Sequence, residues 1–458
     1  MTQISNSLQT VIDEFFTFNV ATEPKVIIFI KDITNRFKFT CDFIFKQSLK
    51  INYIITDNET EFLQSVLAKI NYSDKAFDNS AKVVPHGLLS ETEIRKIKIE
   101  HIKRDGTIRF FNTSEDGFGY DIFTSVFYFI SRYEEWLPYF GDKHGRFEPR
   151  ATIFYFLSIY KKPVVDQWVM EFKNYLQKLF PKLIFPEKKF RSISTIDVDN
   201  VYAFKGKPLS RAIGANIRDF LSLNFESIIS RFKTRYFLKS DPFDSYDLQM
   251  ELSQKYQIPL IYFFLYRHNT KFDRTIDPEH PEFIKLLKKV TENNITAGIH
   301  PSYLSSNEPG LFKEETELLR KNSGQDVVFS RQHYLRFDIR KTADDLSNIG
   351  IKYDFSMGYA VDVGFKAGTC LPFYFFDLNS NTQKQLLTVP FCVMDGAFYN
   401  YLRTQPKEAE KEINDFITEI KNVNGLFVSV FHDRTFSETT FPGWKALYIR
   451  LQEKLKAE

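Results

Sequence analysis

From Arg191 onward, short β-prone segments alternate with segments of helical periodicity, and this alternation constrains the fold more than any other feature. Strands are predicted at 191–196, 259–265, 295–299, 327–330, 351–354, 372–378, 386–391 and 426–431. Helices are predicted between several of them, at 282–293, 308–321, 341–348 and 406–421. Repeated strand–helix units are typical of α/β folds with a parallel sheet. We expect a distorted (β/α) barrel rather than an open sheet, with its chemistry on the loops that follow the strands.

The first part of the chain, residues 1–185, is predicted to form a smaller α/β domain with a support or interaction role. Two short strands and two amphipathic helices are predicted in it, at 26–30, 51–55, 121–136 and 163–180. The segment 181–189 contains Pro and Lys and is the best candidate for a domain boundary. The barrel domain would then span 190–458.

Composition narrows the class of protein. Hydrophobic residues make up 43% of the chain and charged residues 26%, a balance typical of soluble globular proteins. The net charge of +3 provides no global field for nucleic acid, so we expect no nucleic-acid partner. The widely spaced Cys41, Cys370 and Cys392 indicate neither a zinc ribbon nor a disulfide framework. Neither a signal peptide nor an apolar run of about 18 residues is found, so we expect a cytoplasmic protein without a transmembrane segment.

Residues 205–240 interrupt the alternation and lengthen the loop after the first barrel strand. The segment is basic and amphipathic. It could be a helix packed on the top of the barrel, a lid, or a patch for an acidic substrate or a membrane surface.

Two carboxylates stand at the end of the first barrel strand, in the segment STIDVDN. Residues i and i+2 of a strand lie on the same side, so Asp197 and Asp199 should face the same space, with Val198 turned away. Two like charges at short range raise one pKa or recruit a cation. The pair suits a metal ligand beside a general base, although two solvated loop carboxylates would have the same sequence.

Other polar residues follow several predicted strands, where the chemistry of a barrel is expected. They are His268, His300, Arg331, His333, Arg336, His432 and Asp433. Four of the eight histidines of the chain belong to this set. His101 and His144 have no partner at ligand spacing and are predicted to be surface residues.

These residue types form a consistent set of chemical roles. A cation held by one carboxylate and imidazoles polarises a carbonyl group and acidifies water. Asp197 could take the proton of that water, and His432 could protonate a departing amine. Arg331 could hold the base carboxylate in place. The set predicts metal-assisted hydrolysis of an amide or an ester.

In order and spacing, the motifs TIDVDN, GIHPSY, SRQHYLRF, GIKYDFSMGYAVDVGFKAGTCLPF and SVFHD resemble the NodB-homology polysaccharide deacetylases, over about residues 190–440. The closest resemblance is to a bacterial branch in which DVD replaces the usual paired Asp motif. The segments SRYEEW and PVVDQW resemble the uncharacterised N-terminal region of that branch. The resemblance implies a distorted (β/α)7 barrel and a divalent metal, commonly zinc, held by Asp-His-His. It also implies removal of acetyl groups from N-acetylated sugars.

Residue by residue, the resemblance implies that Asp197 is the catalytic base and that Asp199 and His300 are metal ligands. The base would be oriented by Arg331 or by a residue of the 364–372 loop, and His432 would be the general acid.

The chain departs from the family pattern at Leu304, where the family usually has its second metal-binding His. Leu cannot bind a metal, so His333, or else His268, must supply the third ligand, or the site is weak or lost. Where related chains have Arg, this one has Lys366. Lys keeps the positive charge but lacks the planar guanidinium group, which can donate two parallel hydrogen bonds.

The sequence thus favours a metal-dependent carbohydrate de-N-acetylase, with Tyr303, Lys366 and Arg336 predicted to contact the sugar. One alternative, motivated by Leu304, is a barrel that has lost hydrolysis and binds carbohydrate or a partner protein. Aromatic residues near the strand ends would then stack on sugar rings or simply pack in the core: Tyr262, Tyr303, Tyr334, Phe373 and Tyr374. Hydrolysis of a non-sugar C–N bond uses the same chemistry and is a further alternative.

Overall fold

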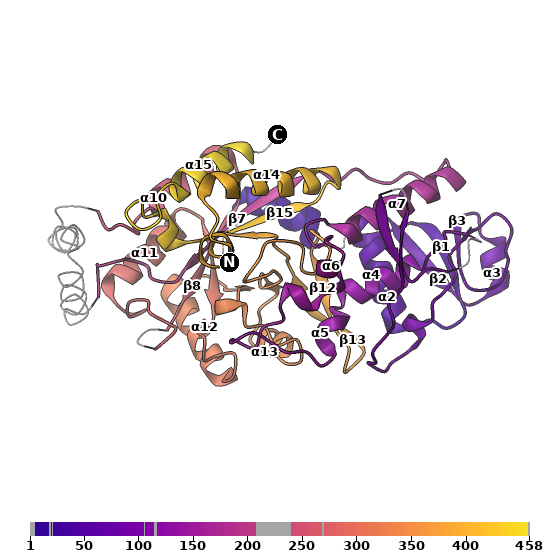
Figure 1. The fold of residues 1–458 in the computed structure, drawn as a ribbon, viewed down its shortest axis with the longest axis horizontal. Coiled ribbons are helices and arrows are strands. Elements are labelled where there is room, and N and C mark those ends of the chain that lie inside the picture. Colours follow the sequence, from indigo (N-terminus) through magenta and orange to yellow (C-terminus); the bar gives the residue numbers. More distant parts are fainter. Residues whose placement is uncertain are drawn as a thin grey trace.

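The computed structural model describes residues 5–17, 20, 22–104, 106–113, 117–207, 240–267 and 270–456. The structure is a mixed α/β fold with two main sheets, which lie toward opposite ends of the long axis (Figure 1). Most of the basic 205–240 segment, residues 208–239, and His268 lie outside the described residues.

The N-terminal sheet has four parallel strands in the order β2-β1-β3-β4. These are β1 (Pro24–Ile30), β2 (Asn52–Thr56), β3 (Ala68–Tyr72) and β4 (Ala81–Lys82). The side chains of β1 alternate between two packing clusters because successive strand residues face opposite sides. Val26 and Ile28 join the main core, whereas Ile27 and Phe29 pack with Phe62. The strands predicted at 26–30 and 51–55 are therefore present.

Helices cover both faces of this sheet. On one face, four helices contact one another and contribute to the main core. They are α2 (Asn35–Cys41), η2 (Asp42–Ser48), α4 (Ile122–Ile130) and α7 (Val164–Leu179). On the other face, α3 (Glu59–Gln64) contributes Phe62. The single helix predicted at 121–136 is wrong, because Arg132 has a left-handed φ of 56° and separates α4 from α5 (Tyr133–Trp136).

The remaining elements of the N-terminal part are short. They are α1 (Asn6–Val11), η1 (Ile12–Phe16), η3 (Leu88–Ser90), the antiparallel pair β5 (His101–Arg104) and β6 (Thr107–Phe110), η4 (Pro149–Ala151) and α6 (Ile153–Phe156).

The larger sheet has nine strands in the order β12-β13-β11-β10-β9-β8-β7-β15-β14. All neighbouring pairs are parallel except β12 and β13. The strands are β7 (Arg191–Val198), β8 (Leu260–Leu265), β9 (Thr296–His300), β10 (Phe329–Ser330), β11 (Tyr353–Asp354), β12 (Phe373–Asp377), β13 (Thr382–Thr388), β14 (Val393–Met394) and β15 (Leu426–His432). All eight predicted strands are present with shifted ends, and β14 was not predicted.

One continuous segment of the chain, residues 382–394, pairs with the two outermost strands of the parallel array. β13 pairs with β11, and β14 pairs with β15. Only residues 389–392 separate β13 from β14, and Phe391 among them is buried. The prediction placed this strand at 386–391 because residues 389–391 are also apolar, whereas the structure uses 389–392 to cross from one edge to the other.

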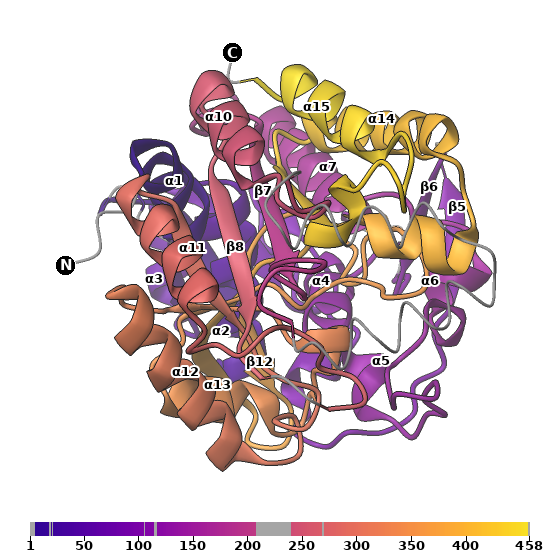
Figure 2. The same ribbon diagram turned by 90° about the vertical axis from the view of Figure 1, so that its left-hand side faces the viewer.

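Six helices lie against the outside of the larger sheet, and Figure 2 shows most of them around β7 and β8. They are α10 (Tyr246–Tyr256), α11 (Pro281–Glu292), α12 (Pro309–Ser323), α13 (Thr342–Asn348), α14 (Pro406–Asn422) and α15 (Trp444–Lys454). The four helices predicted after residue 280 correspond to α11–α14. Short turns complete the described elements: η5 (His333–Leu335), η6 (Ala397–Leu402) and η7 (Asp433–Phe436).

The two parts of the chain share one hydrophobic core, which includes residues from α2, α4, β7 and β12. Polar contacts join them as well. The Gln47 side chain donates to the Pro372 carbonyl at 2.9 Å, and Asp166 accepts from the Cys370 amide at 2.8 Å. A boundary near 181–189 stays a prediction. Among the described helices, none has both the length and the apolar character that crossing a membrane requires.

Candidate functional site

The carboxylates at the end of β7 face a common neighbour, as expected from their i, i+2 spacing. Asp197 and Asp199 are both buried, at 2% and 8% exposure, and Val198 is fully buried. His300 Nε2 lies 3.9 Å from Asp197 Oδ2 and 3.5 Å from Asp199 Oδ1. The two carboxylates are therefore not solvated loop residues.

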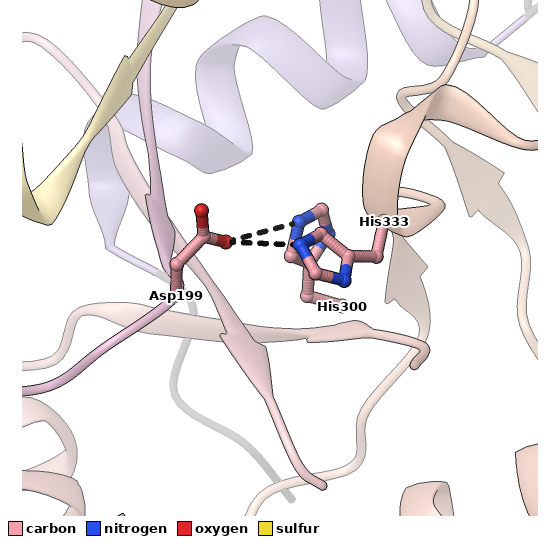
Figure 3. A group of neighbouring side chains, drawn as sticks. All are labelled: Asp199, His300 and His333. Carbon is pink, nitrogen blue, oxygen red and sulfur yellow. Dashed lines mark ion pairs between the residues drawn. The ribbon is translucent and has the colours of Figure 1, made fainter. Parts of the chain in front are cut away.

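Asp199, His300 and His333 form a compact group of three donors (Figure 3). His300 ends β9, and His333 begins the η5 turn after β10. His333 Nε2 lies 3.7 Å from Asp199 Oδ1, and the three donor atoms all lie within 4.8 Å of one another. Three strand ends that are distant in sequence thus supply one oxygen and two nitrogen donors.

The chemistry of these donors fits a divalent cation. The Nδ1 of His300 donates to the Arg331 carbonyl at 2.5 Å, and that of His333 donates to Asp273 Oδ1 at 2.8 Å. In a neutral imidazole with the proton on Nδ1, Nε2 carries a lone pair, which is the usual arrangement of metal-binding histidines. Asp199 Oδ1 is buried and has no hydrogen-bond partner among the described residues. Such an atom is costly to bury unless it has a ligand.

The electrostatics agree with this assignment. Burial lowers the pKa of His300 to about 4, although Asp197 partly opposes the shift, so the imidazole is neutral at pH 7. Burial alone would raise the pKa of the Asp199 carboxyl, but the imidazoles of His333, His432 and His300 hold it below its usual range. One ionised carboxylate and two imidazoles suit zinc and similar borderline cations.

His333 lies where it could supply the donor that Leu304 cannot provide, and Leu304 itself has an exposed fraction of 38%. The turn that carries His333 is strained, because the next two residues, Tyr334 and Leu335, have left-handed φ values of 58° and 53°. Arg146 Nη1 supports the turn by donating to the Tyr334 carbonyl at 2.9 Å.

Asp273, which the sequence reasoning missed, fixes the orientation of His333. It is fully buried in the loop after β8, and it also accepts from the Tyr303 amide at 2.9 Å and the Thr270 hydroxyl at 2.8 Å. An acidic residue in a loop after a barrel strand was the only available signal.

We expect Asp273→Asn to lower zinc affinity by about 10- to 100-fold, as is typical when the partner of a metal-binding histidine is changed. The amide can still occupy the space but no longer offers a charged acceptor. Zinc competition with a chromophoric chelator measures the effect. The exposed Glu279→Gln in the same loop is the matched control, and equal affinities for the two variants would contradict the assignment.

Arg331 forms an ion pair with Asp197. Arg331 Nη1 lies 2.6 Å from Asp197 Oδ1, and both side chains are buried. The guanidinium also donates from Nε to the Phe355 carbonyl at 3.1 Å and lies over the Phe263 ring. Lys366, in the alternative 364–372 loop, instead pairs with Glu135 at 3.2 Å.

His432 ends β15, beside an aspartate that the sequence reasoning also missed. Its Nδ1 lies 2.6 Å from Oδ1 of Asp395, which follows β14 on the adjacent strand. Burial alone would lower the pKa of His432, but the Asp395 charge and hydrogen bond raise it to about 9. The imidazole is therefore protonated at pH 7. Because Asp395 engages Nδ1, the proton on Nε2 remains for transfer.

Asp433 has a structural role next to the group of Asp199, His300 and His333. It is fully buried, and its Oδ2 accepts from the Asn200 amide at 2.7 Å, which fixes the backbone directly after Asp199. Burial and the nearby Asp199 charge raise the pKa of its carboxyl.

An open cavity of about 1270 Å³ contains all five central residues in its wall: Asp197, Asp199, His300, His333 and His432. The N-terminal part adds Lys143, His144 and Arg146 to the wall. The prediction of His144 as a surface residue is wrong: it is half-buried, and its Nδ1 lies 3.1 Å from the Tyr303 hydroxyl. His101 is exposed, as predicted.

The three residues predicted to contact a sugar, Tyr303, Arg336 and Lys366, are not among the residues that line this cavity. The Tyr303 ring is stacked on Phe272 at 3.9 Å, and Arg336 lies over Tyr303 at 4.1 Å. Of the other aromatic residues considered, Tyr334 lines the cavity, whereas Tyr262 and Phe373 are buried in the core. The aromatic residues of the wall are Phe204, Phe243, Phe272, Tyr334 and Tyr401.

Comparison with known proteins gives partial likenesses. Residues 26–181, less than half of the chain, match a family of unknown function, DUF7033. No curated protein sequence matches the chain.

Structural likenesses cover about three-fifths of the chain. A candidate polysaccharide deacetylase from Mycobacterium smegmatis is 12% identical over 60% of this chain and 86% of that chain, with a TM-score of 0.39. The polysaccharide deacetylase Bc1974 from Bacillus cereus is 12% identical over 58% and 89%, with a TM-score of 0.29. A CE4 family pseudoenzyme from Bacillus anthracis is 12% identical over 58% of this chain and 62% of that chain, also with a TM-score of 0.29. At this level of superposition the likenesses do not assign an activity.

Proposed function

We propose that this protein is a metal-dependent hydrolase that removes the acetyl group from an N-acetylated sugar or glycan precursor. The observation that carries the proposal is the convergence of Asp199, His300 and His333 on one point beside Asp197. The metal, which we expect to be zinc, would be held by these three residues. The supporting fold would be a (β/α)7 barrel of β7–β11, β15 and the segment 382–394, which borders both β11 and β15.

Each residue of the candidate site has a separate role in the proposed reaction. A divalent cation held by Asp199, His300 and His333 supplies Lewis acidity, which polarises a carbonyl group and acidifies water. Asp197, fixed by Arg331, accepts a proton from water as its oxygen attacks the acetyl carbon. His432, protonated at pH 7, donates a proton to the nitrogen as the C–N bond breaks. Acetate and an amino sugar are the products.

The residues that line the cavity favour an N-acetylated sugar over a simple amide as the substrate. Phe272, Tyr334 and Tyr401 provide aromatic faces in a space of about 1270 Å³, which is large enough for more than an acetamide group. The alternative of an impaired barrel was motivated by Leu304, and the position of His333 beside Asp199 supports the hydrolase over that alternative. The other alternative, hydrolysis of a non-sugar C–N bond, is one of the results that the acetate-release experiment below can give. A cytoplasmic location and the lack of a nucleic-acid partner stay predictions.

We expect the zinc-loaded protein to release acetate and free amine in equal amounts from N-acetylglucosamine oligomers. A chelator should stop the release, and added zinc should restore it. The Asp199→Ala variant is the negative control, because it lacks the carboxylate ligand. If acetate is released only from N-acetylated peptides, the substrate is a non-sugar amide. If the native protein binds no divalent metal, the proposal is contradicted.

A further inference from the structure

The wall of the cavity has an excess of positive charge. Among the described residues that line it, the Lys and Arg side chains are Lys143, Arg146, Lys207, Lys271, Arg274 and Arg434. The only carboxylates of this described lining are Asp197 and Asp199. Asp197 is paired with Arg331, and Asp199 belongs to the metal-binding group. Among the described residues, neither carboxylate forms an ion pair with Lys143 or Lys271.

Two of the cations, Lys143 and Lys271, have no carboxylate partner within the described part of the chain. Arg434 interacts electrostatically with Asp199 and Asp433. Arg146, by contrast, is paired with Asp142 at 2.6 Å. Lys271 lies over the Phe272 ring at 5.2 Å, and Arg434 Nε donates to the Tyr399 hydroxyl at 3.0 Å. The charges of Lys143 and Lys271 are therefore not cancelled by nearby carboxylates.

Two of these cations enter the wall together from separate parts of the chain. Lys143 precedes His144, and Lys271 precedes Phe272, whose ring lies 6.1 Å from the His144 ring. Both rings pack near Tyr334, at 4.9 Å and 5.8 Å, and Tyr334 directly follows His333. The two lysines are thus placed on the side of the cavity from which His333 enters the metal-binding group.

We propose that the substrate is an N-acetylated sugar that carries a phosphate or carboxylate group, and that Lys143 and Lys271 bind this group. The proposal rests on the proposed function for the position of the acetyl group. An anionic group beside two ammonium donors forms charge-assisted hydrogen bonds, which a neutral sugar cannot form. The exposed lysines would also attract an anionic ligand from a distance at low ionic strength.

The test compares three ligands on the zinc-loaded full chain by isothermal titration calorimetry. The ligands are neutral N-acetylglucosamine, N-acetylglucosamine 1-phosphate and the carboxylate-bearing N-acetylmuramic acid. We expect at least one charged sugar to bind about 10-fold or more tightly than the neutral sugar, and the preference to weaken with added salt. The two charged arms distinguish phosphate from carboxylate.

The double variant Lys143→Glu/Lys271→Glu should remove the preference without changing zinc affinity. Both lysines are exposed, so we expect the variant to fold. The control is Lys285→Glu/Lys313→Glu, which changes the net charge equally at exposed positions of α11 and α12 outside the cavity. Equal binding of neutral and charged sugars, or a preference that survives the charge reversal, would overturn the proposal.

The same ligands in the acetate assay separate this proposal from the proposed function. A charge preference in binding with no acetate release supports the anion site and contradicts the hydrolase. Acetate release with equal kcat/KM for neutral and charged sugars supports the hydrolase and overturns the anion site.

Discussion

Asp197→Asn is expected to lower kcat by about 10²- to 10⁴-fold, the usual contribution of a positioned general base, while zinc stays bound. Asn keeps the shape of Asp but cannot accept the proton of water. Asp197 also lies 3.9 Å from His300 without being one of the three converging donors, so zinc affinity should change little. Acetate release and zinc competition, measured on the same preparation, separate the two effects.

The substitution also removes the partner of buried Arg331, and breaking such a pair typically costs about 3–5 kcal/mol of stability. Activity must therefore be measured well below the melting temperature. Asp354→Asn is the matched control, because Asp354 is a buried carboxylate at the end of β11 that does not line the cavity. An Asp197→Asn variant with native kcat would show that another group takes the proton.

His333→Ala is expected to weaken zinc binding by more than about 100-fold, because loss of a ligand should exceed the 10- to 100-fold cost of losing a partner of that ligand. Activity should fall with zinc occupancy. The prediction follows from the 3.7 Å distance between His333 Nε2 and Asp199 Oδ1. Zinc competition and metal analysis of the purified variant measure it directly.

Two further variants test whether His333 is the third ligand. Leu304→Ala changes the position at which the resembled family usually has its second histidine, and we expect native zinc affinity. His268→Ala changes the competing candidate, and the same result is expected. Native affinity in His333→Ala combined with a loss in His268→Ala would assign the third ligand to His268 instead.

The N-terminal part contributes more to the candidate site than its interpretation as a support or interaction domain implied. Its residues Lys143, His144 and Arg146 line the cavity. Arg146 holds the strained turn at Tyr334, and the His144 carbonyl accepts from Arg336 Nε at 3.3 Å. The contact between the N-terminal and C-terminal parts of the chain therefore forms part of the cavity wall. The segment that matches the family of unknown function includes these three residues.

The sequence by itself determined the α/β class, the positions of eight strands and the edge of the larger sheet at which these polar residues gather. Parallel strands end at one edge, so polar residues placed after them along the chain must gather in space. For this reason order and spacing could predict that Asp197, Asp199, His300, Arg331 and His432 lie close together. The i, i+2 rule likewise predicted that the two carboxylates face one side.

Only the tertiary structure decided which side chains meet across loops. Periodicity describes the faces of strands and helices, but loop conformation depends on long-range packing. The left-handed turn at Tyr334 brings His333 to Asp199, and Asp273 and Asp395 become the partners of His333 and His432. The same packing covers Tyr303 with Phe272, so the cavity has a different aromatic wall from the one expected.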